Sequence, residues 1–181
     1  MLRRSGVADE ITDQTPPAAG SRPAGSRIAS VGDLPYMLGH GDGDSLPPPF
    51  AIPALPARED ALRDKLAEFG PQPWIGVTWR AGTPNLRQAL TKEAPAALFA
   101  SALQKVPGTI VVVQRNPADG EIERFASAVQ RPVLDLSDTN DDVEDLLALS
   151  GLLDTYAGVS NTKTHLRAAR GRTSQAQKYH E

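Results

Sequence analysis

Segments with strand character and segments with helix character alternate from residue 58 to residue 172, and this alternation constrains the fold more than any other feature. The clearest strand is 109–113, Thr-Ile-Val-Val-Val, a β-branched run of the kind that is buried on both faces of a sheet. Other strands are predicted at 74–79, 132–136 and 152–159, and helices at 62–69, 95–106, 122–129, 141–149 and from 162 onward. Short connections between alternating strands and helices predict an α/β fold, a parallel sheet with helices on both faces.

The spacing of apolar residues indicates which helix faces turn inward. One predicted face carries Leu62, Leu66 and Phe69, and another carries Leu98, Phe99, Ala102, Leu103 and Val106. We also expect strand 155–159 to lie beside strand 109–113. Polar clusters follow three strands: Arg80, then Gln114-Arg115-Asn116, then Ser160-Asn161-Thr162. Because ligands bind beyond the carboxyl ends of parallel strands, these clusters are predicted to meet at one rim of the sheet.

The chain divides into three parts by composition. Residues 1–57 hold nine of the 16 prolines, and these nine lie from Pro16 to Pro56. We predict that this part is a Pro/Gly-rich remnant of an N-terminal domain and linker without a core of its own. Residues 58–172 form the predicted α/β domain. Residues 173–181 are a polar tail, which we expect to supply no strand.

Composition and charge exclude several classes of protein. The chain has no cysteine, so it has neither a disulfide framework nor a thiolate metal site. A net charge of −3 gives no general attraction to nucleic acid or to an acidic membrane, and no apolar run approaches the roughly 20 residues that span a bilayer. The acids from Asp138 to Asp145 lack a histidine to complete a metal shell, and we interpret them as a solvated face that matches the helix dipole. A cytoplasmic protein is expected.

The run from Val159 to Arg172 predicts an anion site. A strand is followed here by a helix that Thr162 is placed to cap, and a helix N-terminus offers unpaired N–H groups and partial positive charge to a phosphate. No Asp or Glu lies between Asp154 and Glu181, whereas the basic residues Lys163, Arg167, Arg170, Arg172 and Lys178 do. The whole run is therefore interpreted as a basic surface for a phosphate.

Each candidate side chain has a second interpretation. Arg80 follows a strand and either binds a phosphate or sugar hydroxyl or caps a loop at the surface. Lys92 either neutralises one charge of a diphosphate or is simply solvated. His165 either donates an N–H to a phosphate oxygen or packs and bonds a backbone carbonyl. Asn161 and Thr162 have side chains suited to capping and to ligand contact alike.

Several motifs occur in a characteristic order: IGVTWRAGTPN (75–85), KEAP (92–95), VVVQRNPADGEIE (111–123), DLSDTNDDVEDLLALSGLLDTYAGVSNT (135–162) and HLRAARGR (165–172). The stretch 74–172 thereby resembles the C-terminal half of bacterial two-Rossmann-domain (GT-B type) glycosyltransferases. The nearest are those attached to tetratricopeptide repeats, which are distantly similar to O-linked N-acetylglucosamine transferases and lipopolysaccharide heptosyltransferases. The resemblance implies a Rossmann-like domain that binds the diphosphate and sugar of a nucleotide sugar through Arg80, Lys92, Asn161, Thr162 and His165. It implies no metal cofactor, because basic side chains and a helix dipole stabilise the leaving diphosphate.

The chain departs from that family at both ends. The family has a complete N-terminal domain for the acceptor, of which only LRRSGVADEI and the segment near Asp33-Leu34-Pro35 remain, and it continues past Arg172 with a hydrophobic strand. We therefore expect the donor-binding part of a glycosyltransferase, a truncated fragment that is weak or inactive alone. The alternatives are a non-catalytic nucleotide-binding or interaction module, docked on a separate chain that supplies the missing domain, and a non-functional fragment with an open sheet edge.

Overall fold

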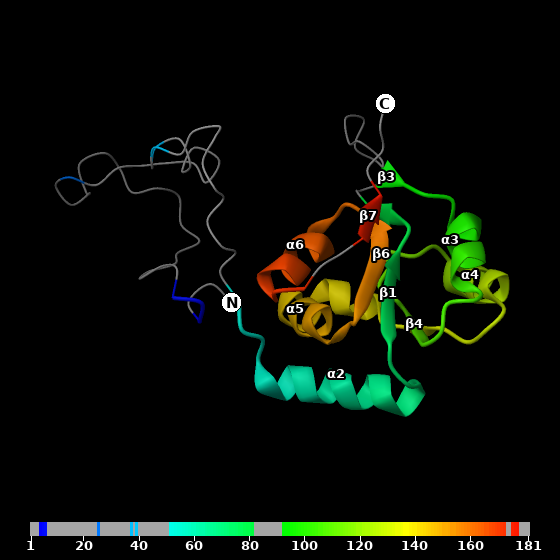
Figure 1. Ribbon diagram of the computed structural model, residues 1–181, viewed down its shortest axis with the longest axis horizontal. Coiled ribbons are helices and arrows are strands. Elements are labelled where there is room, and N and C mark those ends of the chain that lie inside the picture. Colours follow the sequence, from blue (N-terminus) through cyan, green and yellow to red (C-terminus); the bar gives the residue numbers. More distant parts are fainter. Residues whose placement is uncertain are drawn as a thin grey trace.

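The computed structural model describes residues 4–6, 25, 37, 39, 51–81, 92–172 and 175–177 of the 181-residue chain (Figure 1). The expectations for Asp33-Leu34-Pro35 and for the end of the motif 75–85 lie outside these residues, as do those for most of LRRSGVADEI, for Lys178 and for the rest of the tail after Gln177. Within the described residues, the chain folds around one parallel sheet with helices on both faces, so the predicted α/β class is confirmed.

The sheet has five strands in the order β5-β4-β1-β6-β7, and every neighbouring pair is parallel. The strands are β1 (Trp74–Thr78), β4 (Thr109–Val112), β5 (Leu134–Asp135), β6 (Thr155–Val159) and β7 (Gln175–Gln177). The strands at the centre are the most apolar and the most buried, since both of their faces are covered by helices.

One expected adjacency is wrong. Strand β6 pairs with β1, Ile75 opposite Thr155, and β1 separates it from β4. The chain first winds outward from β1 through β4 to β5 and then returns to the other side of β1. This reversal makes the gap between the carboxyl ends of β1 and β6 a topological switch point, which is where open α/β sheets bind ligands.

Two helix layers enclose the sheet (Figure 1). Helices α3 (Ala96–Leu103) and α4 (Glu121–Val129) cover one face, and α5 (Val143–Leu152) and α6 (Thr162–Ala169) cover the other. Helix α2 (Pro56–Phe69) packs against α5. Ile52, which precedes α2, donates its backbone N–H to the carbonyl of Ala169 and is buried in the core, so the domain includes residues just before position 58.

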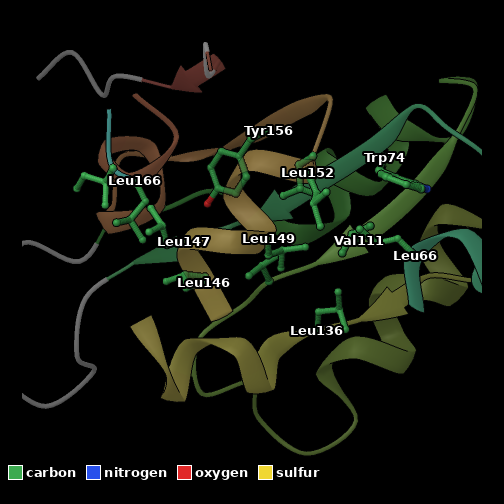
Figure 2. Close-up of a cluster of buried hydrophobic side chains, with 13 residues drawn as sticks. Leu66, Trp74, Val111, Leu136, Leu146, Leu147, Leu149, Leu152, Tyr156 and Leu166 are labelled. Carbon is green, nitrogen blue, oxygen red and sulfur yellow. The ribbon is translucent and has the colours of Figure 1, made fainter. Parts of the chain in front are cut away.

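The larger core cluster lies between the sheet and helices α2, α5 and α6. Figure 2 shows its side chains in a row, with Leu166 at one end and Leu66 and Trp74 at the other. Helix α5 contributes four of the eight buried leucines, because it is apolar on nearly every side and all residues from Leu146 to Leu152 are buried. On the opposite face, Trp79 stacks on Phe125 with ring centroids 4.5 Å apart.

The predicted inward faces hold only in part. Leu66 is fully buried and Leu62 packs partly on the core, but Phe69, at the last position of α2, is 41% exposed. In α3 the buried residues are Ala100 and Leu103, whereas Leu98 is 67% exposed and Ala102 is also exposed. A helix of eight residues that is apolar all round leaves its inward face undetermined by sequence, so packing against α4 decides it.

Four short elements were not expected. Strands β2 (Arg80–Ala81) and β3 (Lys92–Glu93) form an antiparallel ladder, and the 3-10 helix η2 (Ser137–Asp141) precedes α5, whose N-cap is Asp142. The fourth is β7, which contradicts the expectation that the polar tail supplies no strand. Ladder hydrogen bonds join backbone groups, which glutamine and alanine carry like any other non-proline residue. None of the helices among the described residues combines the length and the apolarity that crossing a bilayer requires.

Candidate functional site

A pocket of about 250 Å³ opens at the switch point between β1 and β6, and we call it the switch-point pocket. Its lining comes from the ends of three strands and from the start of helices on one face: Arg80, Ala81, Arg115, Asn140, Val143, Leu146, Asn161, Thr162 and Lys163. Three of these residues are cationic and none is a carboxylate. The pocket is therefore suited to an anion.

A second hollow, about 470 Å³, lies between α2 and the η2–α5 segment and is lined by Arg58, Lys65, Asp138 and Asp145 among others. It is larger, but it lies away from the carboxyl ends of the strands and mixes both signs of charge. We therefore regard the switch-point pocket as the candidate site.

The N-terminus of α6 forms one wall of the switch-point pocket. Asn161 is the N-cap: its backbone is extended and its Oδ1 accepts the N–H of Lys163 at 2.8 Å. Thr162 is the first helical residue, so the expectation that Thr162 caps this helix is wrong, and Asn161 has taken that position. The buried Tyr156 hydroxyl accepts a hydrogen bond from Nδ2 of Asn161 at 3.0 Å. Burial raises the pKa of Tyr156, so its hydroxyl stays neutral and holds Asn161 in place.

Arg80 reaches the pocket from the end of β1 and is held by partners of its own. Gln114, which is buried, accepts the backbone N–H of Arg80 at 3.1 Å and donates to its carbonyl at 3.1 Å. The guanidinium of Arg80 donates to Glu121 at 2.9 Å and to the carbonyl of Asn116 at 3.3 Å. Burial opposes ionisation of Glu121, but hydrogen bonds from Ala118 N–H and the Trp79 indole, with the charge of Arg80, hold its pKa below the ordinary value. Arg80 is thus fixed in orientation and partly neutralised.

Lys163 and Arg115 also line the pocket. The sequence placed Lys163 in the predicted anion site and Arg115 in a polar cluster after a strand, but neither was among the five residues expected to bind the ligand. Lys163 is only 6% exposed, and no described side chain accepts a hydrogen bond from its ammonium. Burial, with repulsion from Arg115, lowers the pKa of Lys163 to about 8. The available signal was helical spacing: Lys163 precedes the buried Leu166 by three positions and so shares its inward stripe.

The five residues expected to bind a nucleotide sugar are not all brought together. Arg80, Asn161 and Thr162 line the switch-point pocket. Lys92 is exposed on β3, directly across the β2–β3 ladder from Ala81, and is not part of the lining. His165 is exposed on α6, one turn after Thr162, and is also outside the lining.

The interpretation of the whole basic run as an anion surface is wrong for three of its arginines. Arg167 is 1% exposed and donates to the carbonyls of Ser150 and Leu153 at the end of α5, at 3.0 and 2.9 Å. Arg172 donates to the carbonyl of Gly151, and Arg170 pairs with Glu59 at 2.8 Å. Arg167 and Arg172 thus bind carbonyls at the C-terminal end of α5, where a helix leaves such groups unpaired. Arg170 instead attaches the end of α6 to Glu59 of α2 and to the carbonyl of Ile52.

The acids near the start of α5 also have structural partners. Arg58 of α2 donates to Asp142 at 2.5 Å and to Asp145 at 2.6 Å. Among the described residues, no group of three His, Cys, Asp or Glu side chains is placed to hold a metal ion. Instead, these acids join α2 to α5.

Comparisons with protein-family models, with curated proteins and with solved structures give no match to this chain. The function is therefore argued from the geometry of the switch-point pocket and from the motif resemblance.

Proposed function

We propose that this chain binds a nucleotide sugar by its diphosphate in the switch-point pocket, as the donor-binding part of a glycosyltransferase. The observation that carries the proposal is the coincidence of a topological switch point, a capped helix N-terminus and three cationic side chains in one pocket, with no carboxylate among its described lining residues. Each of these features favours a phosphate group.

The size of the pocket supports binding of the phosphates rather than of the whole ligand. Pockets that enclose a complete small molecule are roughly 300–1,000 Å³, whereas this one is about 250 Å³. A diphosphate would occupy the pocket, and the nucleoside and sugar would extend beyond it. Lys92 lies across the ladder from Ala81, and His165 lies one turn along α6 from Thr162. The proposal assigns to these two side chains the parts of the ligand outside the pocket.

The proposal assigns donor binding to this chain and leaves proton transfer to another source. Transfer to a hydroxyl acceptor requires a base that accepts the acceptor's proton, and the lining residues that the structure describes include neither a carboxylate nor a histidine. This favours the related function of a binding module that works with a separate chain. Cytoplasmic location and the absence of a metal requirement belong to the same proposal.

Calorimetric titration of the full chain with nucleoside diphosphates and their sugar conjugates tests the proposal. We expect at least one nucleotide sugar to bind, and Arg80→Gln to weaken that binding about tenfold or more because a charge-assisted contact is lost. Arg63→Gln is the matched control, because Arg63 is exposed on α2, also pairs with carboxylates, and is far along the chain from the pocket. Lys92→Ala and His165→Ala are expected to weaken binding of the sugar conjugate more than binding of the free diphosphate.

A folded wild-type chain that binds no member of the panel would overturn the proposal. Binding with no donor hydrolysis and no transfer, even with the acceptor-binding domain of a related enzyme added in trans, would instead identify the non-catalytic binding module.

A further inference from the structure

The most unusual side chain of the switch-point pocket is Lys163. It is more than nine-tenths buried, it lines the pocket, and among the described residues it has no hydrogen-bond acceptor and no carboxylate partner. A buried charge without a partner is costly, and native proteins generally pair such a charge or use it to bind a ligand.

The described groups around Lys163 do not supply a negative charge to pair with its ammonium. The end of β4 contributes Arg115, which repels it, and the end of β1 contributes Arg80, whose partner Glu121 is already engaged. From η2 and α5 the lining residues are Asn140, Val143 and Leu146, which are uncharged, and β6 contributes the neutral Tyr156 beneath Asn161. On α6 itself, His165 is exposed and Arg167 binds the carbonyls of α5.

We propose that Lys163 and Arg115, together with the N-terminus of α6, form an oxyanion subsite that binds a phosphoryl group on its own, without nucleoside or sugar. A phosphoryl oxygen entering this subsite would accept from the Lys163 ammonium and separate it from the Arg115 guanidinium, so both cations gain a partner at once. Arg80 is left to orient the ligand, because its charge is partly compensated by Glu121. The inference deepens the function proposed above and rests on it for the location of the ligand.

The subsite has a direct signature in the titration of Lys163. A bound anion favours the charged amine, so occupancy raises the pKa of Lys163 from its depressed value near 8. The experiment is an NMR pH titration of the full chain labelled with ¹³Cε-lysine, with and without saturating inorganic pyrophosphate. Lysines occur at positions 65, 92, 105, 163 and 178, and Lys163→Met assigns the signal by its disappearance.

We expect one lysine signal to titrate near pH 8 without pyrophosphate and at least one pH unit higher with it, while the other lysine signals stay unchanged. Lys163→Met should weaken pyrophosphate binding about tenfold to a hundredfold, and Lys105→Met, at an exposed position after α3, should leave it unchanged. Arg115→Gln gives a more specific test. Because it removes repulsion, it should raise the pKa of Lys163 in the free protein, and because it also removes a contact to the ligand, it should weaken pyrophosphate binding.

Two outcomes overturn the inference: a Lys163 signal that titrates with the other lysines, or one that pyrophosphate leaves in place. Both outcomes are measured on the wild-type protein, so a variant that fails to fold does not affect this test. If a nucleotide sugar binds while the Lys163 signal stays unmoved, the inference fails and the proposed function stands. If pyrophosphate moves the signal and no nucleotide sugar competes with it, the subsite stands and the proposed function fails.

Discussion

Replacing Lys163 by methionine should make the free protein more stable. In the unfolded chain the lysine has its ordinary pKa of 10.5, whereas in the folded chain burial and Arg115 lower the pKa to about 8. Each pKa unit corresponds to about 1.36 kcal/mol, so the protonated lysine costs the folded state about 3 kcal/mol. Methionine keeps most of the apolar length of the side chain and carries no charge. The substitution should therefore raise the free energy of unfolding by up to about 3 kcal/mol at pH 7.

The pH dependence of this gain follows from the direction of the shift. Below pH 8 both the folded and the unfolded wild-type chain carry a proton on Lys163, and the folded state bears the full cost. Between about pH 8 and 10.5 the folded state loses this proton first, so the unfolded state binds more protons and wild-type stability rises with pH. The advantage of Lys163→Met should accordingly shrink towards zero by about pH 10.5.

Urea unfolding at pH 7 and pH 10, followed by the fluorescence of the buried Trp74 and Trp79, measures both effects. Comparing variant and wild type at each pH cancels other groups that titrate in alkali. Lys105→Met is the matched control and should change stability little at either pH, since Lys105 is exposed. The reasoning is refuted if Lys163→Met is no more stable than wild type at pH 7, or if its advantage is the same at both pH values.

Three further substitutions separate structural side chains from binding side chains. Tyr156→Phe removes the hydroxyl that Asn161 Nδ2 donates to, so we expect a loss of about 1 kcal/mol in urea unfolding together with weaker phosphate binding. Arg167→Met leaves carbonyls at the end of α5 unpaired and should lower the free energy of unfolding by about 3 kcal/mol, while the phosphate affinity of the folded protein stays unchanged. A loss of phosphate affinity without a loss of stability would show instead that Arg167 contributes to binding. Glu121 has a lowered pKa in the folded chain, so its contribution to stability is present above pH 4.5 and is lost as the pH falls. Glu121→Gln should abolish this part of the loss of stability in acid and release Arg80 from its ion pair. An acid unfolding profile that the substitution leaves unchanged would contradict the pairing.

The sheet could be predicted from sequence because its strands carry strong local signals, and the order of the strands could not. A β-branched run such as 109–113 is a strong local signal for a strand, but which strand it pairs with depends on where each connection crosses the sheet. The short ladder of β2 and β3 was missed for a similar reason, since two-residue strands have no periodicity to detect.

Those parts of the candidate site that depend on the position of the backbone could be predicted from the sequence. Those that depend on the direction of a side chain could not. Asn161 and Thr162 follow a strand and open a helix, so their place at the rim of the sheet follows from the fold class. The basic run gave no indication that Arg167 turns towards α5 whereas Lys163, four positions earlier, lines the pocket. Positions four apart lie on the same face of a helix, and both side chains are buried, so only the groups around each of them separate their roles.

The most direct test of phosphate binding at the switch point is a two-dimensional ¹H–¹⁵N NMR titration of the full chain with a nucleotide sugar or, failing that, pyrophosphate. The account predicts that the largest amide shifts occur at Ala81, Thr162 and Lys163, where the ends of β1 and β6 face each other. Shifts that concentrate instead around Arg58 and Lys65, in the hollow beside α2, or a spectrum that saturating ligand leaves unchanged, would contradict it.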